Sequence, residues 1–274
     1  MPGHPPILVI GPTTRCGTSL LQRLLNSTGK VVIYGENFAL MQTVPDIIRG
    51  LQRGADTKRK VIGIARDMLV KRIDFEASSL FPDFDDNLAA WSAAFRRIVR
   101  LYEQDAAKLG FQRWGLKHQI RGQSSFALLP KLLPNARYVM IYRDLIAVAR
   151  SAKARWPGDF KGPDDYRRFG RNWHDNVRTM RGLAGDNFLL YRYEDFVADP
   201  EPHLDRLERF VGFDGIDRAV MTRKINDQPV YQPGEGQASG ADYRKPAALS
   251  AGEVELLLSE SKALYSELGY AAAG

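Results

Sequence analysis

The chain has 274 residues, of which 44% are hydrophobic and 26% charged, and it contains one cysteine. This composition excludes intrinsic disorder and a disulfide-stapled scaffold, and no apolar run approaches the ~20 residues of a membrane-spanning helix. The net charge of +7 favours an anionic ligand, whereas no run of five basic residues indicates a nucleic-acid tail. The first residues lack the features of a signal peptide, which predicts a cytoplasmic protein unless an anchor was trimmed.

The opening of the chain predicts a strand, a loop, a helix and a second strand. Residues 7–10 are a short apolar run ended by a Gly-Pro pair, which is typical of a strand buried on both faces of a parallel sheet. Leucines at three- and four-residue spacing mark one face of a helix between Thr18 and Gly29. Residues 31–34 predict the next strand, so the whole is a βαβ unit.

The rest of the chain alternates the same two kinds of element. Helices are expected at 85–109, 124–133 with a break at Pro130, 145–154, 169–180, 204–211 and from the capping box Ser250–Glu253 to about 267, strands at 114–117, 138–142 and 188–191, and a long polar loop at 226–248. No repeat or linker stands out. We therefore expect a single α/β domain over residues 1–274, with a mostly parallel central sheet flanked by helices.

The loop after the first strand is a candidate anion site. It covers residues 11–19 between a strand and a helix, where backbone N–H groups and the helix dipole favour a phosphate or sulfate. It departs from the Walker A pattern, because five residues separate its glycines and Thr18 stands where that pattern has a lysine. An ordinary βα turn with a tightly packed glycine is the alternative.

A second polar group follows the strand at 138–142. Arg143 stands at the carboxyl end of this strand, the end at which open α/β sheets bind ligands. Ser151 and Arg155 are four residues apart, so they share one face of the following helix. Two guanidinium groups and a hydroxyl suit a phosphate monoester, and a solvated basic face is the alternative.

These two motifs together resemble those of sulfotransferases that use 3′-phosphoadenosine 5′-phosphosulfate (PAPS). The signature pairs an Arg-x-Gly-Thr-Ser/Thr loop after the first strand with an Arg…Ser motif after a later one, and the resemblance extends over nearly the whole chain. It is nearest to the tyrosylprotein and Golgi-type branch, whose loop Arg-Ser-Gly-Thr-Thr is followed by a Gly-Glu. The resemblance implies a P-loop-like phosphosulfate loop, PAPS as the donor and 3′,5′-adenosine bisphosphate as the product.

The resemblance also implies which residues hold each part of the cofactor. They are Arg15, Cys16, Gly17, Thr18 and Ser19 for the 5′-phosphosulfate, Arg143, Ser151 and Arg155 for the 3′-phosphate, and Tyr193 and Lys245 for further contacts with the nucleotide and its phosphates. Cys16 departs from the usual serine. Its place at a helix N-terminus beside Arg15 predicts a lowered thiol pKa and a thiol that reacts in the unliganded protein.

The chemistry of the transfer draws attention to residues near the other strand ends. Sulfuryl transfer needs an acceptor aimed at sulfur, a base if that acceptor is a hydroxyl, and cations such as Arg15 where charge builds. Glu36 follows the second strand and matches the base of the resembled branch, and Lys117 matches its catalytic lysine. His118 is the rival base, although strand alternation turns it and Lys117 to opposite faces. An exposed carboxylate and a surface lysine are the alternatives.

The sequence therefore predicts transfer of a sulfuryl group from PAPS to a hydroxyl or amine of a small-molecule, glycan or peptide acceptor. No metal is expected, because four scattered histidines and one cysteine form no ligand cluster. Two other classes stay open, namely a non-catalytic nucleotide- or polyanion-binding module on the same fold and a P-loop kinase.

Overall fold

The computed structural model describes residues 4–37, 39–53, 84–120, 123–222 and 246–271, and a five-stranded parallel sheet forms its centre. The strands are β1 (Ile7–Gly11), β2 (Val31–Tyr34), β3 (Arg113–Gln119), β4 (Arg137–Tyr142) and β5 (Phe188–Arg192), in the order β2-β3-β1-β4-β5. All five residues of β1 are buried, as its unbroken apolar run requires at the middle of such a sheet. The predicted fold class is confirmed.

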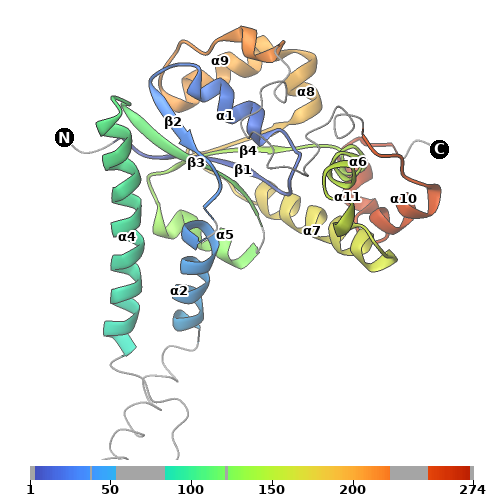
Figure 1. Ribbon diagram of the computed structural model, residues 1–274, viewed down its shortest axis with the longest axis horizontal. Helices are drawn as coiled ribbons and strands as arrows, with labels where there is room; N and C mark the ends of the chain where they lie inside the picture. Colours follow the sequence, from blue (N-terminus) through green and yellow to red (C-terminus); the bar gives the residue numbers. More distant parts are fainter. Residues whose placement is uncertain (1–3, 38, 54–83, 121–122, 223–245, 272–274) are drawn as a thin grey trace, which may run out of the picture.

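Helices cover both faces of the sheet (Figure 1). One face packs against α1 (Thr18–Asn26), α8 (Tyr193–Ala198), α9 (Pro200–Val211) and the short η3 (Arg218–Met221). The other packs against η1 (Ala39–Thr43), α2 (Val44–Gln52), α4 (Phe84–Lys108) and α5 (Gln123–Leu132). Because successive strand residues point to opposite faces, Ile7 and Val9 enter the first core, and Leu8 and Ile10 the second.

A third hydrophobic cluster lies beside the carboxyl ends of the strands. It joins α6 (Leu145–Arg155) and α7 (Pro163–Arg181), which flank η2 (Pro157–Asp159), to α10 (Ala251–Leu258) and α11 (Lys262–Glu267) (Figure 1). A Cβ at Gly170 would lie 2.0 Å from the carbonyl oxygen of Leu257, so glycine is what lets α7 and α10 approach this closely. The C-terminal helices are thereby fixed next to the end of β4.

Two expected features of the helices are wrong. Pro130 lies inside α5 without ending it, because the buried side chains of Leu128 and Leu129 hold the helix against the core. The final helix is interrupted between α10 and α11, where the hydroxyl of Ser261 donates to the carbonyl of Leu257 at 2.9 Å and competes with the helical backbone. No helix of the described residues is long and apolar enough to cross a membrane.

Candidate functional site

The candidate site lies at the carboxyl ends of β1 and β4. In the order β2-β3-β1-β4-β5 the chain leaves β1 towards β2 and leaves β4 towards β5, which makes this a topological switch point. Arg15 Nε donates to Ser151 Oγ at 3.0 Å, and Arg143 Nη1 donates to the carbonyl of Arg15 at 3.4 Å. The two motifs recognised separately in the sequence therefore form one cluster.

The loop between β1 and α1 closes tightly around Gly17. Arg15 has a φ of 63° and Gly17 a φ of 109°, both in the left-handed region that favours glycine. A Cβ at Gly17 would lie 2.6 Å from the ring of Tyr193. The same ring lies 4.4 Å, centroid to Cζ, from the guanidinium of Arg143. Glycine at this position thus lets Tyr193 pack between the loop and Arg143.

The N-terminus of α1 faces this cluster and is open to an anion. Gly17 is its N-cap, no side chain caps the helix, and its first turn holds no acidic residue. Uncapped N–H groups and the positive end of the helix dipole both favour a bound anion. Thr18 and Ser19 begin this helix, so they stand where the resemblance places the phosphosulfate.

Cys16 points into the core, contrary to expectation. Its side chain is fully buried, Sγ donates to the carbonyl of Thr13 at 3.0 Å, and a Cβ at Gly11 would lie only 2.2 Å from Sγ. Burial raises the pKa of the Cys16 thiol to about 11, although hydrogen bonds from nearby N–H groups and the charge of Arg143 act in the opposite direction. The predicted lowered pKa is therefore wrong.

Glu36 and Lys117 form a second group beside the loop. Lys117 Nζ lies 3.8 Å from Glu36 Oε1 and donates to Ser19 Oγ at 3.4 Å. The side chains of Lys117 and Glu36 are 18% and 29% exposed, so both are partly desolvated yet accessible from solvent. The end of β3, the segment after β2 and the first turn of α1 thus bring a cation, a carboxylate and a hydroxyl together.

Gln119 belongs to this group and was not predicted from the sequence. Its Nε2 donates to Glu36 Oε2 at 3.0 Å, and its side chain is buried. It lies two residues after Lys117 on β3 and hence on the same face, which is the signal that could have found it. His118 is buried on the opposite face, where Leu116 joins the core beneath the sheet. This alternation separates the rival base from Lys117.

Helix α7 supports both motifs from behind with buried side chains. Asn176 Nδ2 donates to the carbonyls of Pro12, at 2.7 Å, and Ile120, at 3.0 Å, and so ties the loop after β1 to the end of β3. Trp173 Nε1 donates to the carbonyl of Arg143 at 2.9 Å. Because these side chains lie three residues apart, one face of α7 holds the backbone that follows β1, β3 and β4.

The two remaining residues of the predicted cofactor site are Arg155 and Lys245. Arg155 is exposed at the end of α6, with its guanidinium 5.8 Å from the ring centroid of Trp156. Ser151, one turn earlier, is the α6 residue that reaches Arg15. Lys245 and most of the loop at 226–248 lie outside the described residues.

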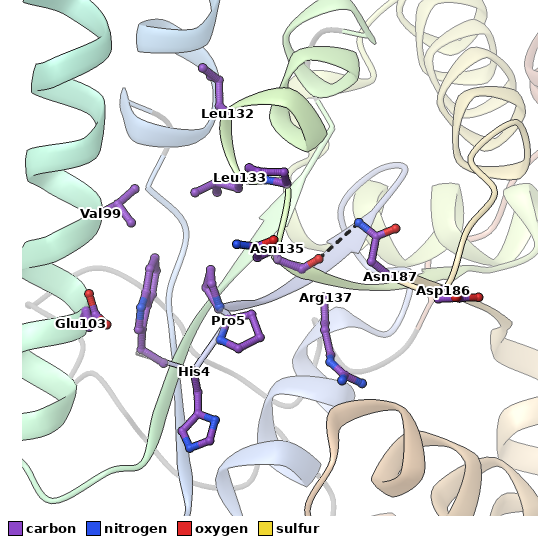
Figure 2. A pocket seen from close by; sticks show the side chains of 14 residues that line it. His4, Pro5, Val99, Glu103, Leu132, Leu133, Asn135, Arg137, Asp186 and Asn187 are labelled. Atoms are coloured by element: carbon purple, nitrogen blue, oxygen red, sulfur yellow. Dashed lines mark hydrogen bonds between the residues drawn. The ribbon is translucent and has the colours of Figure 1, made fainter. Parts of the chain in front are cut away.

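A pocket of about 680 Å³ lies at the amino ends of the strands, opposite the candidate site (Figure 2). It is lined by residues that precede β1, β4 and β5, among them Pro5, Asn135 and Asn187, together with Val99 of α4. Open parallel sheets bind ligands at their carboxyl ends, and the predicted polar side chains gather at that end here. The pocket is therefore separate from the candidate site.

Comparisons with known proteins agree with this fold. The sulfotransferase domain of the olefin synthase of Synechococcus PCC 7002 has a similar fold, with a TM-score of 0.51 and 20% identity over 99% of this chain and 97% of that one. A sulfotransferase from Alicyclobacillus acidocaldarius gives a TM-score of 0.50 and 13% identity over 98% of each chain. A search of curated proteins gave no match. Residues 5–217 match the model of the sulfotransferase family, and the chain therefore belongs to that family.

Proposed function

We propose that this sulfotransferase moves the sulfuryl group of PAPS to an acceptor hydroxyl, with Glu36 as the general base. One observation carries the proposal. The hydrogen bonds among Arg15, Ser151 and Arg143 join two anion-binding motifs at the N-terminus of α1, and the pair Glu36–Lys117 lies beside them. The residues proposed to bind two anionic groups and to remove a proton therefore lie together at the carboxyl ends of the strands.

The hydrogen-bond donors at the carboxyl ends of the strands fit a nucleotide that carries two separate anionic groups. Arg15 and the uncapped N-terminus of α1 suit the 5′-phosphosulfate, and Arg143 with Ser151 suits the 3′-phosphate. The ring of Tyr193, already against Arg143, supplies a flat contact for the nucleotide. Arg155 and Lys245 complete the set proposed from the family resemblance.

The acceptor's proton goes to Glu36 in this mechanism. As the acceptor oxygen bonds to sulfur and the bond from sulfur to the phosphate oxygen breaks, the carboxylate takes the hydroxyl proton. Gln119 and Lys117 each hold one of the two carboxylate oxygens and so fix the orientation of the base. Lys117 and Arg15 offset the negative charge that develops on the leaving phosphate.

Replacing Glu36 by Gln tests this assignment. The variant keeps the shape of the side chain and loses its basicity, so kcat should fall by ~10²–10⁴ while binding of adenosine bisphosphate stays nearly unchanged. The matched control is Glu103→Gln. Glu103 lies on α4 and lines the pocket at the amino ends of the strands, so this change should alter neither kcat nor the binding of adenosine bisphosphate. The acceptor is identified first, by incubating radiolabelled PAPS with extract of the source cells and analysing the labelled product. Near-normal turnover of Glu36→Gln on a confirmed hydroxyl acceptor would exclude Glu36 as the base.

The two rival functions give different results in the same assays. A non-catalytic binding module would bind adenosine bisphosphate but show no acceptor-dependent release of it from PAPS. A P-loop kinase would be protected from thermal unfolding by ATP and not by PAPS. The position of Thr18 at the start of α1, where a Walker A loop has its lysine, speaks against the kinase.

A further inference from the structure

The peptide group between Arg143 and Asp144 is held on both sides by side chains. The Arg143 carbonyl accepts from Trp173 Nε1 at 2.9 Å, and the Asp144 N–H donates to Glu194 Oε1 at 3.0 Å. Strand β4 ends at Tyr142, so this peptide group lies just beyond the strand and is held by side chains instead of by a neighbouring strand. The orientation of this peptide, from which the Arg143 side chain projects, is therefore set by α7 and α8.

Two tyrosines from the C-terminal segment complete this arrangement. The hydroxyl of Tyr265 donates to Asp144 Oδ2 at 2.6 Å, and that of Tyr270 donates to Glu194 Oε2 at 2.7 Å. The remaining oxygen of Asp144 caps α6 by accepting from the N–H of Ala147 at 2.6 Å. Each carboxylate is thus fixed through both of its oxygens, one of which is always held by a tyrosine.

These tyrosines are themselves firmly placed. Tyr265 and Tyr270 are 2% and 8% exposed, and their rings stack with centroids 5.1 Å apart. Arg192 lies over the Tyr270 ring, 4.4 Å from its centroid, and 3.6 Å from Glu194. Burial and the neighbouring carboxylates raise the pKa of both phenols above the ordinary value of 10.0, so their hydroxyls stay protonated in mildly alkaline as well as neutral solution. The neutral phenols are therefore the hydrogen-bond donors to Asp144 and Glu194.

The segment that contains Glu194 also contains a residue of the proposed nucleotide site. Glu194 follows Tyr193, whose ring lies between Gly17 and the guanidinium of Arg143. A shift of Glu194 would therefore move both the peptide behind Arg143 and the ring beneath it. Tyr265 and Tyr270 lie beyond residues 5–217, so the family match itself draws no attention to them.

We propose that Tyr265 of α11 and Tyr270, which follows that helix, are positioning residues for Arg143 and so control affinity for the 3′-phosphate of the nucleotide. The inference rests on the proposed function, since it is there that Arg143 is given the 3′-phosphate. The hydroxyls act through Asp144 and Glu194 and need not touch the ligand. Their loss should weaken binding of a ligand with a 3′-phosphate and leave a ligand without one almost unaffected.

The test compares Tyr265→Phe and Tyr270→Phe with the parent protein in calorimetric titrations. The ligands are adenosine 3′,5′-bisphosphate and adenosine 5′-monophosphate. Each variant keeps its ring and loses one hydrogen bond to a carboxylate, so the Kd for the bisphosphate should rise about threefold to tenfold. The Kd for the monophosphate should change less than about twofold. Tyr191→Phe is the matched control, because its buried hydroxyl donates to the carbonyl of His203 and should affect neither ligand.

A double-variant comparison separates positioning from a general loss of structure. In an Arg143→Ala background, Tyr265→Phe should cause no further loss of bisphosphate affinity, because the residue through which it acts is gone. Additive losses would overturn the proposal, as would equal losses for the two ligands or failure of both phenylalanine variants to fold. If Arg143→Ala itself does not distinguish the ligands, the proposed function fails. If it does and both phenylalanine variants bind like the parent, only the positioning role fails.

Discussion

At the scale of single residues, Gly17 determines whether the loop between β1 and α1 can adopt its observed conformation. Alanine there would be held at a φ of 109° and would place its Cβ 2.6 Å from the Tyr193 ring. We expect Gly17→Ala to lose ~1–3 kcal/mol of unfolding free energy and also to weaken binding of adenosine bisphosphate. Denaturant unfolding and calorimetric titration measure the two effects.

Gly29→Ala provides the control for this prediction. Gly29 also has a positive φ, of 65°, but no atom lies within 4 Å of the position that its Cβ would take. It should therefore lose stability without losing affinity for the nucleotide. Equal binding by the two alanine variants would show that the contact between Gly17 and Tyr193 does not matter for the site.

The thiol of Cys16 should be inert in the folded protein. Burial raises its pKa to about 11, so almost none of it is thiolate at pH 8, and its sulfur is enclosed by Gly11 and Thr13. Iodoacetamide should modify it slowly with or without adenosine bisphosphate, and rapidly once the protein is unfolded in urea. Mass spectrometry reports the modified fraction. Fast modification that the ligand prevents would instead place the thiol in the site.

Cys16 also shows what residue-level reasoning from a sequence omits. The chain places it beside Arg15 at a helix N-terminus, and hydrogen bonds with nearby backbone groups and the charge of Arg143 do act to lower its pKa. The decisive effect is depth, because full burial outweighs them. Depth depends on which strands surround β1, and no local pattern contains that information.

At the scale of elements, Glu253 joins α10 to α6 and α7. Its carboxylate accepts from Lys153 Nζ at 2.7 Å and from the hydroxyl of Tyr166, and it also closes the capping box on Ser250. These interactions, chiefly the one with Lys153, lower the pKa of Glu253 to about 2. Since the folded pKa lies below the ordinary value of 4.5, the stabilisation is present above that value and is lost as pH falls from 4.5 towards 2.

Glu253→Gln should remove this pH dependence. Melting temperatures measured from pH 5 down to pH 2.5 should fall less steeply for the variant than for the parent, and the variant should be less stable at neutral pH. Glu255→Gln, on the exposed side of the same helix, is the control and should follow the parent. A parent and a Glu253→Gln variant with parallel curves would show that the carboxylate is not held as described.

The elements themselves were largely predictable, since periodicity and caps are local properties. The apolar runs predict all five strands, and the capping box at Ser250 and Glu253 forms as expected. The errors occur where tertiary contacts override local preference, as when the core keeps Pro130 within α5. Gln119, Asn176 and Tyr265 were missed for the same reason, because the partners of each lie on other elements.

At the scale of the whole molecule, strand order is what assembles the site. The Arg15 loop and Arg143 are 128 residues apart in the chain and meet because β1 and β4 are neighbours in the sheet. Lys117 reaches Ser19 because β3 lies on the other side of β1. The family motifs imply this convergence, but hydrophobic periodicity alone does not determine strand order. The supporting contacts from α7 and α11 required the complete fold.

Ligand binding should therefore stabilise the molecule as a unit. The proposed nucleotide site connects elements from β1 to α6 and rests on α11, so a ligand that binds only the folded state shifts the unfolding of the whole sheet. At a concentration of 100 times Kd, adenosine bisphosphate should contribute ~2.7 kcal/mol, or a rise in Tm of roughly 5–10 °C for a chain of this size. At the same concentration, adenosine 5′-monophosphate should give a smaller rise in Tm. In the Arg143→Ala variant, the two ligands should give similar rises in Tm. Added salt should reduce the bisphosphate shift most, since two charged groups are screened instead of one. A large shift with ATP and none with the bisphosphate would contradict the nucleotide assignment and favour the kinase.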